Sequence, residues 1–340
     1  MNLDAMSQTA HALVAPGKGI LAADESGPTI AKRLAGIGVE STEKTRRAYR
    51  EILFTTAGIG AAISGVILFD ETLRQRSADG TPFPEVLRRQ DVIAGIKVDG
   101  GTQPLAGFPD EVITEGLDGL RYRLTEYAAL GARFAKWRAV VRIGDGCPTT
   151  TCIEAHAHAL ARYAALAQEV GLVPIVEPEV LMDGSHDLAR CAEVTVTTLR
   201  AVYAELARHR VVLEATLLKP NMVLPGKDCP VQVSDDEIAD TTIAALRQTV
   251  PAAVPGIVFL SGGQTGEQAT SRLDALNRRG PQPWALSFSF GRALQAPVLK
   301  AWAGDDGNRA AAQAALLHRA HLNGAARHGM YTADMEGVRV

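Results

Sequence analysis

The sequence predicts an α/β fold, a closed (β/α)8 barrel of the TIM-barrel type. Two observations lead to it: eight short apolar runs recur along the chain, and segments with helical periodicity lie between them. Most runs are continuous rather than alternating in hydrophobicity, as expected for parallel strands that are buried on both faces. Strands that alternate with helices indicate a parallel sheet, and eight such units form a closed barrel.

The predicted strands are short and rich in Val, Ile and Leu. They cover residues 19–23, 65–69, 92–96, 133–135, 173–176, 215–218, 256–260 and 284–288. The alternative is an open, doubly wound sheet. Its usual nucleotide-binding fingerprint, Gly-x-Gly-x-x-Gly after the first strand, is absent, because Asp24-Glu25-Ser26-Gly27 follows instead.

Three predicted helices are the best defined. Residues 153–170 are rich in alanine and precede Gly171, which suits a C-terminal cap. Residues 188–208 form a second long helix. The third begins at a capping box, Ser234-x-x-Glu237, and continues to about Thr249.

Composition limits the classes of partner and compartment. The 340 residues are 46% hydrophobic and 21% charged, with a net charge of -3, which predicts one globular domain over residues 1–340 with a short N-terminal helical extension and a short C-terminal tail. This charge gives no reason to expect nucleic acid or membrane as a partner. The four cysteines lack Cys-x-x-Cys spacing, and the N-terminus does not resemble a signal peptide. We therefore expect a cytoplasmic protein.

Polar residues close all eight runs, and in a barrel the chemistry takes place where the strands end. These residues are Asp24, Asp70, Lys97, Lys136, Glu177, Lys219, Ser261 and Ser289. The chain has eight lysines against 27 arginines, yet three of the eight lysines close runs. Because lysine can lose its proton and arginine cannot, this choice indicates that an amine is needed.

Three ammonium groups that converge on one barrel mouth repel one another, so we expect at least one of these lysines to have a lowered pKa. A neutral lysine in a dry cleft is a nucleophile toward carbonyl groups. Asp24, Glu177 and Glu179 supply carboxylates for proton transfer. The two glutamates in Glu177-Pro178-Glu179 point to the same side if the backbone is extended.

Two segments suit a phosphate group. Ser261-Gly262-Gly263 follows the seventh run, where glycines let backbone N–H groups approach an anion. Ser289-Phe290-Gly291-Arg292 follows the eighth and adds a guanidinium group. Barrels often bind phosphate in the loops after strands seven and eight.

We expect no metal and no cofactor. His156 and His158 are two residues apart and do not share a helix face, and His318 and His321 have no carboxylate at a ligand spacing. His186 and His209 are expected to flank one helix.

Six ordered blocks of the sequence resemble class I fructose-1,6-bisphosphate aldolase. They are residues 17–26 (GKGILAADES), 95–99 (GIKVD), 134–138 (FAKWR), 175–179 (IVEPE), 217–222 (LLKPNM) and 260–264 (LSGGQ). The similarity extends from about His11 to about Tyr331. It implies reversible cleavage of fructose 1,6-bisphosphate to dihydroxyacetone phosphate and glyceraldehyde 3-phosphate without metal.

The resemblance also implies roles for individual residues. Lys219 is the Schiff-base lysine, Glu177 is the acid–base residue with Glu179 and Lys136 in support, and Asp24 assists cleavage of the C3–C4 bond. The phosphate-binding residues fall into two groups. The C1 phosphate is held by Ser261, Gly262, Gly291 and Arg292, and the C6 phosphate faces Arg33, Lys97, Arg138 and Thr29.

Some consequences of the resemblance stay open. Many members of the family have a longer tail ending in a tyrosine that helps to protonate C3, whereas the last tyrosine here is Tyr331. The C3 proton carrier is thus unassigned, with Glu179 or a bound water as candidates. The family suggests a homotetramer that acts in glycolysis and gluconeogenesis. Alternatives are another Schiff-base enzyme, such as a transaldolase or a single-phosphate aldolase, and a scaffold without turnover.

Overall fold

The barrel is closed by eight parallel strands in the order β1-β10-β9-β8-β7-β6-β3-β2. The structure is a computed structural model that describes residues 2–231 and 233–337. The barrel strands are β1 (Gly19–Ala23), β2 (Ile63–Leu68), β3 (Ile93–Lys97), β6 (Phe134–Val141), β7 (Val173–Val180), β8 (Leu217–Leu218), β9 (Gly256–Phe259) and β10 (Ala285–Phe290). The predicted (β/α)8 barrel is confirmed, and each predicted run overlaps one of these strands.

Two strands, β6 and β7, are several residues longer than the sequence predicted. β6 and β7 pair in an unbroken parallel register from Phe134 opposite Val173 to Val141 opposite Val180. Lys136 and Glu177 therefore lie within strands rather than directly after them. The polar residues do not end these strands. Their side chains occupy only one face of the sheet, and the backbone hydrogen bonding between the strands continues past them. β8 is shorter than predicted, since a 3₁₀ turn, η2 (Leu213–Ala215), precedes it.

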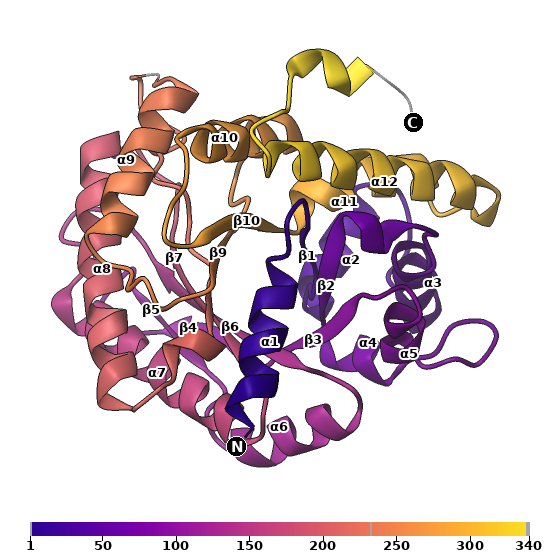
Figure 1. Ribbon diagram of the computed structural model, residues 1–340, viewed down its shortest axis with the longest axis horizontal. Coiled ribbons are helices and arrows are strands. Elements are labelled where there is room, and N and C mark those ends of the chain that lie inside the picture. Colours follow the sequence, from indigo (N-terminus) through magenta and orange to yellow (C-terminus); the bar gives the residue numbers. More distant parts are fainter. Residues whose placement is uncertain (1, 232, 338–340) are drawn as a thin grey trace.

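Helices surround the strands as an outer layer (Figure 1). They are α1 (Leu3–Leu13), α2 (Gly27–Ala35), α3 (Glu43–Phe54), α4 (Asp70–Arg74), α5 (Phe83–Arg88), α6 (Leu120–Ala129), α7 (Thr150–Glu169), α8 (Leu188–Arg208), α9 (Asp235–Arg247), α10 (Gly266–Arg278), α11 (Arg292–Trp302) and α12 (Arg309–Ala326). The bounds of α8 are those predicted, and α9 begins at the predicted capping box of Ser234 and Glu237. Helix α7 begins earlier than predicted, because Thr149 caps it through the backbone N–H of Cys152. None of the helices in the described ranges is long and apolar enough to cross a membrane.

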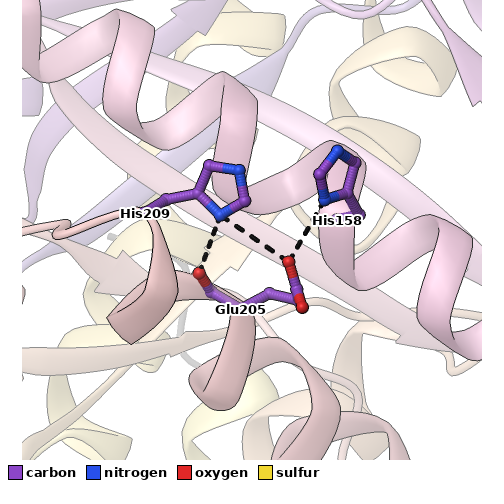
Figure 2. A group of neighbouring side chains, drawn as sticks. All are labelled: His158, Glu205 and His209. Atoms are coloured by element: carbon purple, nitrogen blue, oxygen red, sulfur yellow. Dashed lines mark hydrogen bonds and ion pairs between the residues drawn. The ribbon is translucent and has the colours of Figure 1, made fainter.

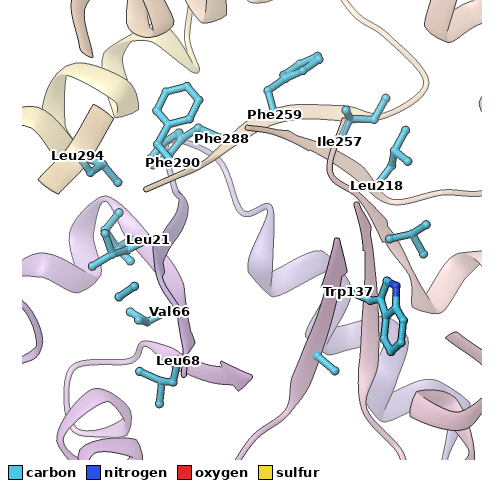
Figure 3. Close-up of a cluster of buried hydrophobic side chains, with 14 of the residues drawn as sticks. Leu21, Val66, Leu68, Trp137, Leu218, Ile257, Phe259, Phe288, Phe290 and Leu294 are labelled. Carbon is cyan, nitrogen blue, oxygen red and sulfur yellow. The ribbon is translucent and has the colours of Figure 1, made fainter. Parts of the chain in front are cut away.

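The alternation of side chains along each strand divides the core into two parts. Outward side chains pack against the helices in the larger cluster, where Leu21, Trp137, Leu218 and Phe259 lie (Figure 3). Inward side chains at the start of the strands form a second, smaller cluster inside the barrel, which includes Phe134. The fold therefore derives most of its apolar packing from the outward face, and the inward face near the strand ends is free to be polar.

Helix α1 closes the barrel end where the strands begin. Its buried residues Met6, Ala10 and Leu13 belong to the inner cluster. Figure 1 shows this helix, in indigo, crossing the barrel. Because α1 fills one end, the opposite end, where the strands terminate, is the one that remains for a site.

One element was not predicted, an antiparallel hairpin of β4 (Gly101–Pro104) and β5 (Val112–Glu115). It follows β3 and lies against β6, where the hydroxyl of Thr114 donates a hydrogen bond of 2.8 Å to the carbonyl of Arg138. The sequence signal was weak because the hairpin is short and β4 is largely exposed.

Candidate active site

Ionisable side chains gather inside the barrel where the strands end. On β6, Lys136 and Arg138 share the inward alternation of Phe134, and on β7, Glu177 and Glu179 share that of Ile175, which belongs to the inner cluster. The strand pleat thus continues each apolar inward row into a charged one. The prediction that the two glutamates point to the same side agrees with their contacts to neighbouring residues of β6.

Lys219 is buried, with 4% of its surface exposed, and directly follows β8. Its Nζ lies 3.1 Å from Oε1 of Glu177, and the other oxygen of that carboxylate lies 3.1 Å from Nζ of Lys136. The backbone N–H of Lys219 donates to the carbonyl of Val176 at 2.8 Å, which fixes the lysine against β7. Glu177 therefore bridges two amines and is within proton-transfer distance of both.

Lys136 lies at the centre of the cluster. Its Nζ is 2.9 Å from Oδ2 of Asp24 and 3.9 Å from Oδ2 of Asp99, in addition to its contact with Glu177. Burial by itself would lower the pKa of Lys136, but the attraction of Asp24, Glu177 and Asp99 outweighs it and raises the pKa above its usual range. For Asp24, burial raises the pKa, yet the charges of Lys136 and Lys219 lower it well below its usual range. Lys136 is thus an ammonium group and Asp24 a carboxylate at neutral pH.

At Lys136 the expected effect of like charge is not seen. Like charge was expected to lower the pKa of at least one of the three lysines, whereas the pKa of Lys136 is raised. The physical reason is that carboxylates alternate with the cations: Lys97, Lys136, Arg138 and Lys219 are matched by Asp24, Asp99, Glu177 and Glu179. Opposite charge at about 3 Å outweighs repulsion from more distant like charge.

Asp99 is a member of the cluster that the sequence reasoning missed. Its side chain is buried, its Oδ1 lies 3.0 Å from Nζ of Lys97, and its Oδ2 accepts a hydrogen bond of 3.2 Å from the backbone N–H of Arg138. The signal was its position two residues after Lys97, which places both side chains on the same face. Arg138 in turn pairs with Glu179 through its Nε at 2.5 Å. Asp99 thereby joins the end of β3 to the middle of β6.

The two predicted phosphate-binding segments lie side by side, as β9 and β10 are neighbours in the barrel. Gly262 adopts a positive φ of 55° just after the buried Ser261. Gly291 is the N-cap of α11, and Nη2 of Arg292 donates 2.7 Å to the carbonyl of Gly262. A left-handed glycine beside a helix N-terminus and a guanidinium group forms a site suited to an anion.

Arg33 and Thr29, both on α2, lie on the β10 side of the mouth. A β-carbon added to Gly291 would meet Nη2 of Arg33 at 4.0 Å, so this guanidinium borders the Gly291 segment. The hydroxyl of Thr29 is exposed and lies 3.1 Å from that of Ser26. Among the described residues, no ion pair or hydrogen bond joins either residue to the Lys97 and Arg138 with which the sequence reasoning grouped them.

Glu25 holds Arg33 and was also missed. Its buried carboxylate pairs with Arg33 and with the buried Arg50, and it accepts 2.7 Å from Nε2 of Gln295. The same Gln295 amide donates to the carbonyl of Ala22 at the end of β1. This network ties α2 and α3 to α11 behind the site, a role visible only once distant segments are brought together.

Comparison with known proteins assigns nearly the whole chain to one family. The family model described as fructose-bisphosphate aldolase class-I (Glycolytic) matches residues 5–339. The chain belongs to the class I fructose-bisphosphate aldolase family. It is therefore an aldehyde-lyase of glycolysis, and the resemblance drawn from its sequence is confirmed.

Individual members of the family are very similar to this chain. A probable class 1 fructose-bisphosphate aldolase of Xanthomonas axonopodis pv. citri is 58% identical over 97% of this chain and 99% of its own length. A cytosolic fructose-bisphosphate aldolase of Arabidopsis thaliana is 56% identical over 98% and 93%. A structure of Plasmodium falciparum fructose-bisphosphate aldolase, solved with TRAP and a small-molecule inhibitor, superposes with a TM-score of 0.96 at 48% identity and covers 97% of this chain and 96% of its own.

Proposed function

We propose that the protein cleaves fructose 1,6-bisphosphate reversibly to dihydroxyacetone phosphate and glyceraldehyde 3-phosphate through a Schiff base on Lys219. The observation that carries the proposal is the buried amine of Lys219, 3.1 Å from the carboxylate of Glu177. An amine in a dry site beside a carboxylate has both the nucleophile and the proton acceptor that imine formation requires.

The first half of the reaction joins enzyme and substrate. Nζ of Lys219 attacks the C2 carbonyl of the ketose while Glu177 accepts a proton from the amine. Glu177 then returns a proton to the carbinolamine hydroxyl, which leaves as water, and a protonated imine remains. Lys136, which stays an ammonium group, holds Glu177 in place through its 3.1 Å contact.

The second half breaks the C3–C4 bond. The carboxylate of Asp24 accepts the proton of the C4 hydroxyl, the C4 carbonyl forms, and the bonding electrons move into the imine to give an enamine. The protonated imine supplies the electron sink that a metal ion supplies in metal-dependent aldolases. Protonation at C3 and hydrolysis then release dihydroxyacetone phosphate. Glu179 or a bound water is proposed as the carrier of this proton.

The phosphates are proposed to occupy opposite sides of the mouth. Ser261, Gly262, Gly291 and Arg292 would hold the C1 phosphate, and Lys97, Arg138, Arg33 and Thr29 the C6 phosphate. The position of Arg33 beside Gly291 favours a contribution of this residue on the C1 side of the mouth as well. Comparing kcat/KM for fructose 1,6-bisphosphate and fructose 1-phosphate in Arg33→Ala separates the two: a C6 role removes the preference for the bisphosphate, whereas a C1 role weakens both substrates alike.

The proposal extends to assembly, place and flux. We propose a homotetramer in the cytoplasm that serves gluconeogenesis as well as glycolysis, without a cofactor and with sugar phosphates as its ligands. The family resemblance and the cytosolic names of two Arabidopsis thaliana relatives support these assignments. Light scattering of the purified protein tests the tetramer.

Borohydride trapping tests the central claim. The protein is incubated with dihydroxyacetone phosphate, reduced and digested, and the adduct is located by mass spectrometry. We expect the adduct on Lys219, with none in Lys219→Arg, and an undiminished adduct in Lys300→Arg, which changes an exposed lysine in the last turn of α11. EDTA should leave the cleavage rate unchanged. An active enzyme that gives no adduct on Lys219, or one inhibited by EDTA, would contradict the proposal.

A further inference from the structure

The outer surface carries a group of metal-ligating side chains that the reaction does not use. His158 lies on α7, Glu205 on the last turn of α8, and His209 is the residue that caps α8. Among the described residues, these three form the one group of His, Cys, Asp or Glu whose ligand atoms all lie within 4.8 Å of one another. Figure 2 shows the two imidazole rings on either side of the carboxylate.

Two of the three separations between the ligand atoms match those around a small metal ion, and the third is within 4.8 Å. Oε2 of Glu205 lies 3.2 Å from Nδ1 of His158 and 3.6 Å from Nδ1 of His209. Tetrahedral zinc has bonds of about 2.0–2.2 Å to nitrogen and oxygen ligands, so two of its ligand atoms are about 3.3 Å apart. The two distances lie on either side of this value, so these ligand atoms suit one ion without a rearrangement of either helix.

We propose that His158, Glu205 and His209 bind one Zn²⁺ ion, with the fourth position open to solvent. Two imidazole nitrogens and one carboxylate oxygen are a donor set that zinc accepts. Nδ1 of His209 also lies 3.0 Å from the carbonyl oxygen of Glu205, so a zinc bond at this nitrogen replaces that hydrogen bond.

The surroundings orient the ligands and leave room for the ion. The other oxygen of Glu205 pairs with Arg208, which directs Oε2 toward the histidines in the way outer partners orient metal ligands. The side chain of Glu205 is 14% exposed and that of His158 is 54% exposed, so the site is anchored in the surface but reachable from water. Both histidines line a cavity of about 510 Å³ that gives the ion and its water ligand access.

The site would act on the fold rather than on the cleavage chemistry. It joins α7 to the end of α8, two helices of the outer layer, and so lies outside the barrel that holds Lys219. An ion that binds the folded chain and not the unfolded one stabilises the fold by mass action. Residue spacing does not reveal the site, because His158 is 47 residues away from Glu205 along the chain.

Calorimetric titration of the full-length, EDTA-treated protein with zinc chloride tests the proposal. We expect one ion per chain and a rise in the thermal unfolding midpoint on addition of zinc. Loss of a ligand should weaken binding by at least about tenfold, in His158→Ala and in Glu205→Gln, and should remove the rise in the midpoint. His321→Ala, which changes an exposed histidine on α12, is the matched control and should behave as the wild type.

Two results would overturn the proposal. One is a wild type that takes up no zinc. The other is a His158→Ala protein that binds zinc as tightly as the wild type, which would place the ion on other ligands. His158 is largely exposed, so this variant keeps the fold, and circular dichroism checks that it does. Cleavage activity without zinc should be the same in wild type and His158→Ala, so a failed zinc titration leaves the aldolase assignment untouched.

Discussion

Replacing Lys136 by methionine should leave a single carboxylate without its cation, and that carboxylate is Asp24. Glu177 keeps Lys219 at 3.1 Å and Asp99 keeps Lys97 at 3.0 Å, whereas among the described residues the one ion pair of Asp24 is with Lys136. Breaking a buried ion pair on one side costs about 3–5 kcal/mol. Since the side chain of Asp24 is 13% exposed, we expect the lower end, about 3 kcal/mol.

This loss should be visible as a shift of the thermal midpoint. The entropy of unfolding is about 2.1 cal/mol/K per residue, so a 340-residue chain has about 0.7 kcal/mol/K, and 3 kcal/mol lowers the midpoint by about 4 °C. Scanning calorimetry at one fixed protein concentration measures it, because an oligomer has a concentration-dependent midpoint.

The pH dependence has a definite sign. In the wild type the pKa of Asp24 is lowered, so its pairing contributes stability above the unfolded pKa of about 3.9 and loses it as the pH falls further. The raised pKa of Lys136 contributes stability below the unfolded pKa of about 10.4 and loses it as the pH rises through the folded value. In Lys136→Met, Asp24 loses the closest of the cations that lower its pKa, so burial raises that pKa and the carboxylate takes up a proton closer to neutral pH. The difference between the two proteins should be largest near pH 7 and shrink toward about pH 4.

The double variant Lys136→Met/Asp24→Asn decides whether this reasoning holds. Removing the stranded charge should recover most of the lost stability, so the two substitutions should be strongly non-additive. A double variant no more stable than Lys136→Met would refute the assignment of Asp24, and so would a destabilisation that does not change with pH.

Three further changes test other parts of the molecule. Glu177→Gln should slow formation of the borohydride-trapped adduct by about 10²–10⁴-fold while the fold is kept, measured by quenched mass spectrometry; an unchanged rate would remove this residue from proton transfer. Glu25→Gln should raise KM by about tenfold with little change in kcat, because Arg33 loses the carboxylate that positions it; a fall in kcat alone would argue against that role. Gly95→Ala should destabilise by about 1–3 kcal/mol in urea unfolding, since the new β-carbon would lie 2.3 Å from the ring of Phe134; a neutral effect would mean that the ring moves freely.

The barrel could be predicted because its strands are buried on both faces at their starts. Apolar residues then follow one another without alternation, as in the run that became β1. The prediction stopped too early in β6 and β7, where inward residues turn polar while outward ones such as Trp137 and Val176 stay apolar. Apolar periodicity measures burial and not backbone pairing, so Lys136 and Glu177 were interpreted as strand ends.

Site residues that follow a predicted strand were predicted from the sequence. Those whose role depends on contacts with distant segments were missed. Lys219 directly follows β8 and Gly262 lies in the loop that follows β9, so a parallel barrel brings them to one mouth. Asp99 and Glu25 gain their roles only from partners far along the chain, as in the pair of Glu25 with Arg50. The group of His158, Glu205 and His209 was missed for the same reason. It joins two helices, and residue spacing within one helix does not reveal it.

The charges in the mouth serve two purposes. Those inside the barrel set protonation states, and positive charge at the rim is available to bind the substrate. Inside the barrel four cations and four carboxylates alternate, so the cluster is close to neutral and its charges are used to fix protonation states. A substrate with two phosphate groups still needs positive charge. Arg292 is exposed at the rim, and within the described ranges its hydrogen-bond partner is the carbonyl of Gly262 rather than a carboxylate. Its charge is therefore not offset by a neighbour, which makes it available to an anionic ligand while Lys136 and Glu177 keep their partners.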